Sequence, residues 1–133
     1  MPLLIDTNVA IYLRDGDVGV TERLIARGER PAISIVTLIE LECGVNARPE
    51  LHAERRRGVA LLLRRVTIEP LDRVIVEAYG AIVLETGFSR RRILDRLIAA
   101  TALVHGLTLV TTNGDDFRDI PGLDLEVWPA PPQ

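Results

Sequence analysis

Four acidic residues spread along the chain are the side chains best suited to catalysis. Asp6 and Asp116 follow short apolar, strand-like runs, whereas Glu40 and Asp95 lie in helical patterns. Carboxylates that converge in one crevice repel one another and raise one another's pKa values unless cations neutralise them. Oxygen ligands without histidine or thiolate select Mg²⁺ or Mn²⁺ over zinc. Because one or two such ions can activate water and stabilise the oxygen that leaves phosphorus, the pattern indicates phosphodiester hydrolysis.

Three of these acids also have a purely structural interpretation. Asp6 can cap the helix that follows it. Glu40 closes the segment Thr37-Leu38-Ile39-Glu40, which has the pattern of a capping box whose glutamate reaches back to the threonine N–H. Asp116 can interact favourably with the dipole of a short helical turn. Taken singly, these acids could be structural.

Asp95 is not explained by capping. Its neighbours at helical spacing are apolar, so we expect it on the core side of its helix, among Ile98, Ala99 and Ala102. A carboxylate on such a face costs several kcal/mol unless something pairs with it. Asp95 therefore indicates a cation site.

Short strand-like runs alternate with helical patterns along the chain. Strands are predicted at 3–5, 32–36, 66–68, 107–111 and 125–128. Helices are predicted after Asp6, at 18–27, 37–45, about 49–65, 72–87 and 89–104, with a helical turn at 115–118. This alternation predicts an α/β fold with a short, mostly parallel central sheet covered by helices on both faces. The ligand site of such a sheet lies beyond the carboxyl ends of its strands.

Length and composition limit the class of protein. A chain of 133 residues fits one domain, 1–133. No apolar run is long enough to span a bilayer, and the N-terminus lacks the basic region of a signal peptide, so we expect a cytoplasmic protein. The single cysteine, Cys43, lies in an apolar helical pattern, which predicts a packed thiol and no internal disulfide.

The basic residues are all arginine, 16 in number. The absence of lysine excludes P-loop and Schiff-base chemistry. Net charge is −3, but clustered arginines can still form a basic stripe that tracks nucleic acid. They can equally be solvated helix faces. The candidate nucleic-acid-binding residues are Arg55, Arg56, Arg57, Arg90, Arg91 and Arg92.

Four segments that contain the acids resemble a known family. They are Leu4–Asn8, Ser34–Leu41, Asp95–Ala102 and Leu109–Phe117. In order and spacing they look like the four successive motifs of PIN-domain nucleases, and specifically of the VapC toxins. The similarity covers nearly the whole chain. Any one motif is weak evidence of kinship, whereas four in order are strong.

The resemblance implies both a site and a biological role. It implies a PIN-like three-layer fold in which Asp6, Glu40, Asp95 and Asp116 bind Mg²⁺ or Mn²⁺, supported by Thr112 and Asn113. Asp115 either substitutes for its neighbour Asp116 or only shapes local charge. The implied activity is RNA cleavage by the toxin of a type II toxin–antitoxin pair. Homodimerisation and inhibition by a small VapB-type antitoxin are implied with it.

Two other functions are compatible with the fold that these motifs imply. A housekeeping PIN nuclease that processes its own RNAs would share the same motifs, and an antitoxin gene beside this one would argue against it. A catalytically silent PIN module that binds RNA or protein predicts a damaged set of acids, whereas all the matching acids are present. Phosphatases with an aspartyl nucleophile are set aside, since they need a second aspartate where Asn8 stands and a lysine that the chain lacks.

Overall fold

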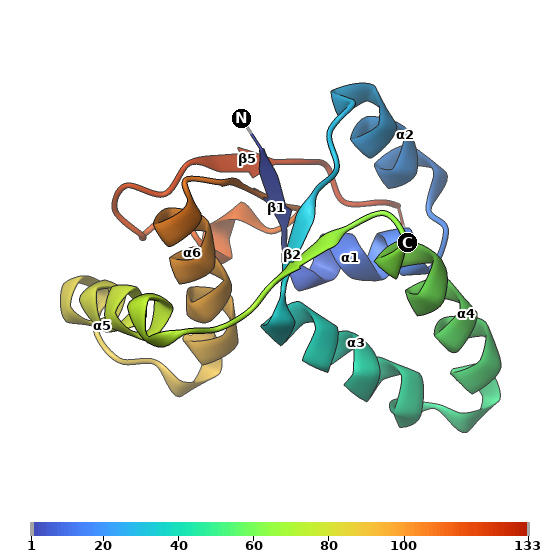
Figure 1. Cartoon of the computed structure of the whole chain (residues 1–133), viewed down its shortest axis with the longest axis horizontal. Coiled ribbons are helices and arrows are strands. Elements are labelled where there is room, and N and C mark those ends of the chain that lie inside the picture. Colours follow the sequence, from blue (N-terminus) through green and yellow to red (C-terminus); the bar gives the residue numbers. More distant parts are fainter. Residues whose placement is uncertain (1, 133) are drawn as a thin grey trace.

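The computed structural model describes residues 2–132, and its centre is a five-stranded sheet (Figure 1). The strand order is β3-β2-β1-β4-β5, and each neighbouring pair is parallel. The strands are β1 (Leu3–Ile5), β2 (Ala32–Ser34), β3 (Thr67–Glu69), β4 (Thr108–Thr111) and β5 (Leu125–Val127). The predicted α/β class is confirmed, with a sheet that is wholly rather than mostly parallel. All carboxyl ends therefore lie along one edge.

Helices cover both faces of this sheet (Figure 1). The helices are α1 (Thr7–Arg14), α2 (Val18–Arg27), α3 (Ile35–Ala47), α4 (His52–Leu63), α5 (Arg73–Thr86) and α6 (Ile93–His105). Leu3 and Ile5 pack in one core with residues of α1 to α4, whereas Leu4 packs in a second core with α5 and α6. Successive side chains of a strand point to opposite faces, which produces the three layers. No helix within residues 2–132 is both long enough and apolar enough to cross a membrane.

The start of α3 differs from the sequence prediction. The sequence predicts Thr37 as the cap and Val36 as the end of the strand, yet β2 ends at Ser34 and α3 begins at Ile35. The Ser34 hydroxyl accepts a hydrogen bond from the Val36 N–H at 3.0 Å and so caps the helix earlier than predicted. Thr37, freed from capping, is fully buried inside the first turn.

Two more helices start later than predicted, each after a 3₁₀ turn. Pro49–Leu51 forms such a turn before α4, and Arg90–Arg92 forms another before α6. Ser89, at the predicted start of the helix 89–104, precedes the 3₁₀ turn and makes no side-chain cap hydrogen bond. Tight turns of this kind are common at helix ends, where they satisfy backbone groups that α-helical bonding leaves free.

Cys43 is exposed, which contradicts the packed thiol predicted for it. Helix α3 buries Leu41 and Val45 completely. Cys43 lies two positions from each, and two helical residues turn through roughly 200°, so its side chain points away from that buried stripe. The apolar residues around Cys43 led to the prediction of a buried position.

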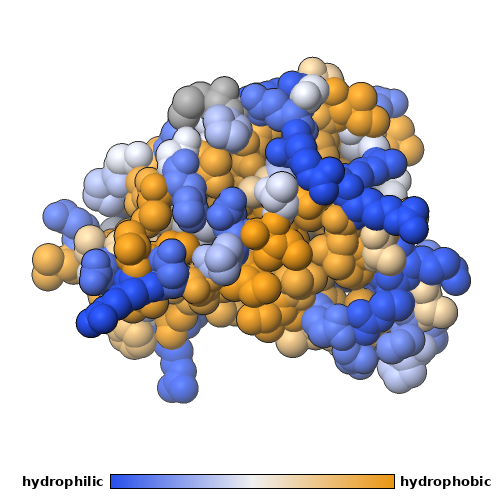
Figure 2. Space-filling view, viewed as in Figure 1, coloured by the Kyte–Doolittle hydropathy of each residue, from blue (hydrophilic) through white to orange (hydrophobic). Residues whose placement is uncertain are grey.

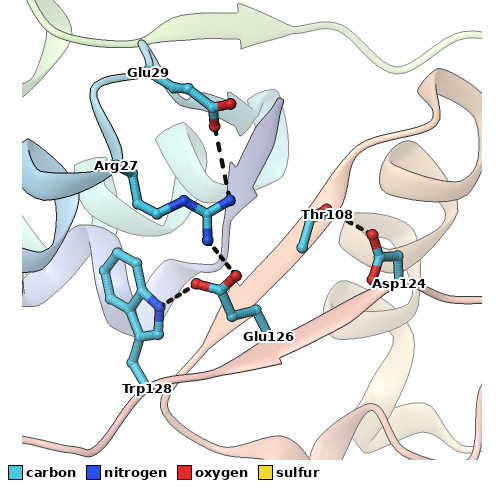
Figure 3. A network of polar contacts seen from close by, with 6 residues as sticks. All are labelled: Arg27, Glu29, Thr108, Asp124, Glu126 and Trp128. Atoms are coloured by element: carbon cyan, nitrogen blue, oxygen red, sulfur yellow. Dashed lines mark hydrogen bonds and ion pairs between the residues drawn. The ribbon is translucent and has the colours of Figure 1, made fainter. Parts of the chain in front are cut away.

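A polar network fastens the edge strand β5 to α2 (Figure 3). Arg27, at the end of α2, forms ion pairs with Glu126 of β5 and with Glu29, the latter at 3.9 Å. Glu126 also accepts a hydrogen bond from the Trp128 indole N–H at 2.6 Å. Because Trp128 is buried in the core beside α2, the network secures an otherwise open sheet edge.

Candidate active site

Asp6 stands directly after β1 and is held by two hydrogen bonds. Its Oδ1 accepts from the Val9 N–H at 2.9 Å, which caps α1 as the sequence predicted. Its Oδ2 accepts from the Thr111 hydroxyl at 2.5 Å. With only 3% of the residue exposed, the carboxylate has a fixed orientation and little water.

Thr111 is a site residue that the sequence analysis missed. The register of β1 against β4 pairs Ile5 with Val110, so the next residues, Asp6 and Thr111, are neighbours. The Thr111 hydroxyl also accepts a hydrogen bond from the Asn113 N–H at 2.9 Å. It therefore joins Asp6 to the segment that follows β4. No local pattern distinguishes such a threonine from an ordinary strand residue.

Glu40 reaches the same region from α3. Its Oε1 accepts a hydrogen bond from the Thr7 hydroxyl at 2.7 Å, and Thr7 also shares a hydrogen bond with Thr37 at 3.0 Å. The predicted capping box is therefore wrong, since α3 begins before Thr37 and Glu40 faces α1 instead. Because β1 and β2 are adjacent, the helices that follow them start side by side.

Asp95 and Asp116 approach from the other side of the sheet edge. Asp95 lies in the first turn of α6 and is half-buried, so it lies at the border of the core rather than inside it. Asp116 ends the 3₁₀ turn Gly114–Asp116, where its Oδ2 accepts from the Asn113 amide at 2.8 Å. Its backbone carbonyl accepts from Arg92 at 3.2 Å.

The supporting residues and the first arginine cluster predicted from the sequence differ in exposure and in hydrogen bonding. Asp115 is exposed and pairs with Arg118, away from the carboxylates that Asp116 faces. Thr112 is half-buried and makes no side-chain hydrogen bond within residues 2–132. Of the first arginine cluster, Arg55 donates to the Gly44 carbonyl and Arg56 to Glu42, both on α3.

The four acids interact electrostatically. Burial raises the pKa of Asp6 from 3.8 to about 6, against the hydrogen bonds from Thr111 and Val9, and the charges of Asp116 and Glu40 raise it further. Burial also raises the pKa of Asp95 to about 6, with added repulsion from Asp116, Asp6 and Glu40 and partial relief from Arg92. Carboxylates near enough to raise one another's pKa values are the arrangement expected of a cation site.

Residues 3–123 match the family model described as PIN domain. The chain belongs to the PIN-domain family. The matched residues include all four acids, Asp6, Glu40, Asp95 and Asp116.

Relatives of this PIN domain include VapC proteins. The chain is 35% identical to ribonuclease VapC1 of Rickettsia felis, with 94% of this chain and 95% of the relative covered. It is 27% identical to the tRNA(fMet)-specific endonuclease VapC of Shigella flexneri, with 96% and 98% covered. Its structure resembles that of VapBC2 from Rickettsia felis bound to a DNA fragment from the promoter, with a TM-score of 0.82, 27% identity, and 96% and 99% coverage.

The four acids suit a hard divalent cation in chemistry, although they are not preassembled around one. Asp6, Glu40, Asp95 and Asp116 offer carboxylate oxygens only, the set that Mg²⁺ and Mn²⁺ accept. Within residues 2–132 no three acidic, histidine or cysteine side chains are close enough together to hold a metal ion. Mutual repulsion keeps uncompensated carboxylates apart. Binding of a cation therefore requires a further convergence of these side chains.

The raised pKa values predict how stability of the metal-free PIN domain depends on pH. A carboxyl whose folded pKa exceeds its unfolded pKa stabilises the fold when protonated, and this contribution is lost as pH rises through the folded value. For Asp6 the window runs from 3.8 to about 6 and corresponds to roughly 2–3 kcal/mol. We therefore expect the melting temperature in EDTA to rise as pH falls from neutral through about 6.

The expected rise in melting temperature stops near pH 4.5, before the lower end of the Asp6 window. There Glu42, Glu50 and Glu126, whose pKa values are lowered from 4.5, begin to lose stabilising charge. The control is the double variant Asp6→Asn, Asp95→Asn, which should show little rise above that limit. A wild-type melting temperature that falls steadily from neutral pH to 4.5 would contradict the electrostatic description of the site.

Proposed function

We propose that this protein is a Mg²⁺- or Mn²⁺-dependent endoribonuclease that acts as the toxin of a type II toxin–antitoxin pair. The observation that carries the proposal is that Asp6, Glu40, Asp95 and Asp116 lie at one edge of the parallel sheet. Burial raises the pKa values of Asp6 and Asp95, and the charges of the other acids raise them further. Kinship with proteins named ribonuclease VapC supports the same activity.

Hydrogen bonds from the chain's own residues orient three of the four carboxylates. The proposed ligands are Asp6, Glu40, Asp95 and Asp116; a bound Mg²⁺ would supply a Lewis acid for phosphodiester hydrolysis. Thr111 and the Val9 N–H fix the orientation of Asp6, and Thr7 fixes that of Glu40. Asn113 fixes Asp116. These hydrogen bonds act as the outer shell that orients ligands.

An apolar groove supports the proposed antitoxin. A cavity of about 330 Å³ lies between α1, α2 and α4, and its lining includes Leu13, Val18, Leu24 and Leu61. Val18 is 68% and Leu61 59% exposed. Such a groove suits an apolar helix or extended segment of a partner. We propose that the partner also places an arginine or lysine among the four carboxylates, where a guanidinium takes the place of a cation.

A second apolar surface supports the proposed homodimer. Figure 2 shows an apolar patch at the centre of the face between α3 and α5. Ile39, Leu71 and Val74 are exposed large apolar side chains of these elements and of the segment between them. Contiguous apolar surface of this kind is typical of protein interfaces.

The direct test of the proposed activity is the cleavage of purified RNA. We expect cleavage in Mg²⁺ or Mn²⁺ and none in excess EDTA. Sequencing of RNA ends in cells, after induction of the chain without its neighbouring gene, would identify the substrate and separate a toxin from a housekeeping nuclease. Full activity in excess EDTA would overturn the metal-dependent mechanism.

A further inference from the structure

The segment between α5 and α6 presents an aromatic ring and two cations to solvent. Phe88 is 70% exposed, and Arg90 and Arg91 lie near it on the same segment. Neither guanidinium has an ion pair or hydrogen bond within the part of the chain that the structure describes. The structure therefore gives these three side chains no internal role. This distinguishes Arg90 and Arg91 from Arg55 and Arg56, which bind α3.

Arginines from the candidate site hold this segment in place. Arg96, only 3% exposed, donates from Nη1 to the Gly87 carbonyl at 2.7 Å, and its Nη2 lies 3.6 Å from Asp119. Arg92 donates to the Asp116 carbonyl at 3.2 Å. The residues on either side of Phe88, Arg90 and Arg91 are thus tied to the segments that carry Asp95 and Asp116. Figure 1 shows this connection running from the end of α5 to the start of α6.

The combination of side chains suits unpaired nucleic acid. Bases in single strands stack on exposed aromatic rings, and guanidinium groups bind the adjacent phosphates. A loop that is already held in place loses little conformational entropy when a ligand binds. Less of the favourable free energy of its contacts is therefore offset. A phenylalanine exposed to water without a partner gains most from such stacking, because the base covers its apolar face.

We propose that Phe88 stacks on an unpaired base of the RNA while Arg90 and Arg91 contact backbone phosphates beside that base. The inference rests on the proposed ribonuclease function for the class of ligand and deepens it by assigning a binding subsite. Phe88, Arg90 and Arg91 position the strand across the carboxylates; they take no part in the hydrolysis itself.

Fluorescence of Phe88→Trp tests the stacking directly. The native chain has one tryptophan, Trp128, which is 4% exposed, so emission accessible to acrylamide comes from the substituted position. Asp6→Asn and EDTA prevent cleavage. We expect a short single-stranded RNA to quench this emission and to protect it from acrylamide. An abasic strand of equal length, which offers phosphates without bases, should do so much less. Equal quenching by both strands, or no quenching by either, would overturn the stacking.

Affinity measurements supply matched controls. Phe88→Ala should raise the Kd for single-stranded RNA roughly tenfold, whereas Phe88→Tyr should keep it near wild type. Leu84→Ala, which removes another apolar side chain that is 86% exposed, should leave the Kd unchanged. If Phe88→Ala leaves the Kd unchanged and instead alters the oligomeric mass, Phe88 belongs to a contact between copies and the proposal falls.

The arginines are tested by the salt dependence of binding. The double variant Arg90→Gln, Arg91→Gln should flatten the slope of log Kd against log salt by roughly 0.7 for each phosphate that is no longer neutralised. Arg23→Gln changes an exposed arginine of α2 that is not among the candidate nucleic-acid-binding residues; it is the control and should keep the slope. An unchanged slope in the double variant would overturn the assignment of these arginines to the phosphates. Because these experiments measure binding in EDTA, they can fail while metal-dependent cleavage succeeds, and the reverse also holds.

Discussion

Asp6→Asn is expected to lower RNA cleavage in Mg²⁺ at least ~100-fold without unfolding the protein. The substitution removes one charged ligand from the proposed cation site. Asparagine keeps an oxygen for the Val9 N–H, and its amide can donate to the Thr111 hydroxyl, so both positions that hold Asp6 remain satisfied. Asp95→Asn should have a comparable effect, since it removes the carboxylate of α6 that interacts with Asp6.

Asp115→Asn is the matched control for these variants. It removes one negative charge beside Asp116, but its side chain is 83% exposed and pairs with Arg118. Its cleavage rate should stay near that of wild type. Initial rates in Mg²⁺ and in Mn²⁺, with melting temperatures for every variant, make the comparison. Wild-type rates in both Asp6→Asn and Asp95→Asn would refute the proposed ligand set.

The sheet could be predicted from the sequence because short apolar runs alternate regularly with helical patterns along the chain. Short apolar strands followed by capped helices leave few arrangements other than a parallel α/β sheet. The acids that follow strands, Asp6 and Asp116, then had to lie at one edge, because parallel strands share the direction of their carboxyl ends. These conclusions depend on local patterns and on topology, both of which the sequence contains.

Hydrogen bonds between distant segments could not be predicted in the same way. Thr111 meets Asp6 across 105 positions of sequence, and Thr7 meets Glu40 across 33. Both hydrogen bonds depend on strand register and helix rotation, which a single sequence does not encode in any short pattern. The same limit explains Glu40, where a hydrogen bond to another helix replaces a plausible local cap.

Cell growth should depend on this chain and on the proposed partner. Expression of this chain alone should arrest growth, co-expression of the adjacent small gene should restore it, and Asp6→Asn should be harmless without any partner. The reason is that the proposed partner fills the groove at Val18 and Leu61 and places a cation among the carboxylates, so it blocks the same site that Asp6→Asn disables.

A substitution that places a charge in the groove tests docking of the partner separately from catalysis. Leu61 is 59% exposed, so Leu61→Arg should fold and cleave RNA as wild type does. A partner that buries an apolar segment there would have to desolvate the new guanidinium and leave room for its longer side chain, which weakens binding strongly. Leu61→Arg should therefore arrest growth even with the partner present. The partner should still restore growth with Leu84→Arg, a change on α5 outside the groove. If wild type proves harmless alone while it cleaves RNA in vitro, the toxin assignment falls and the housekeeping nuclease takes its place.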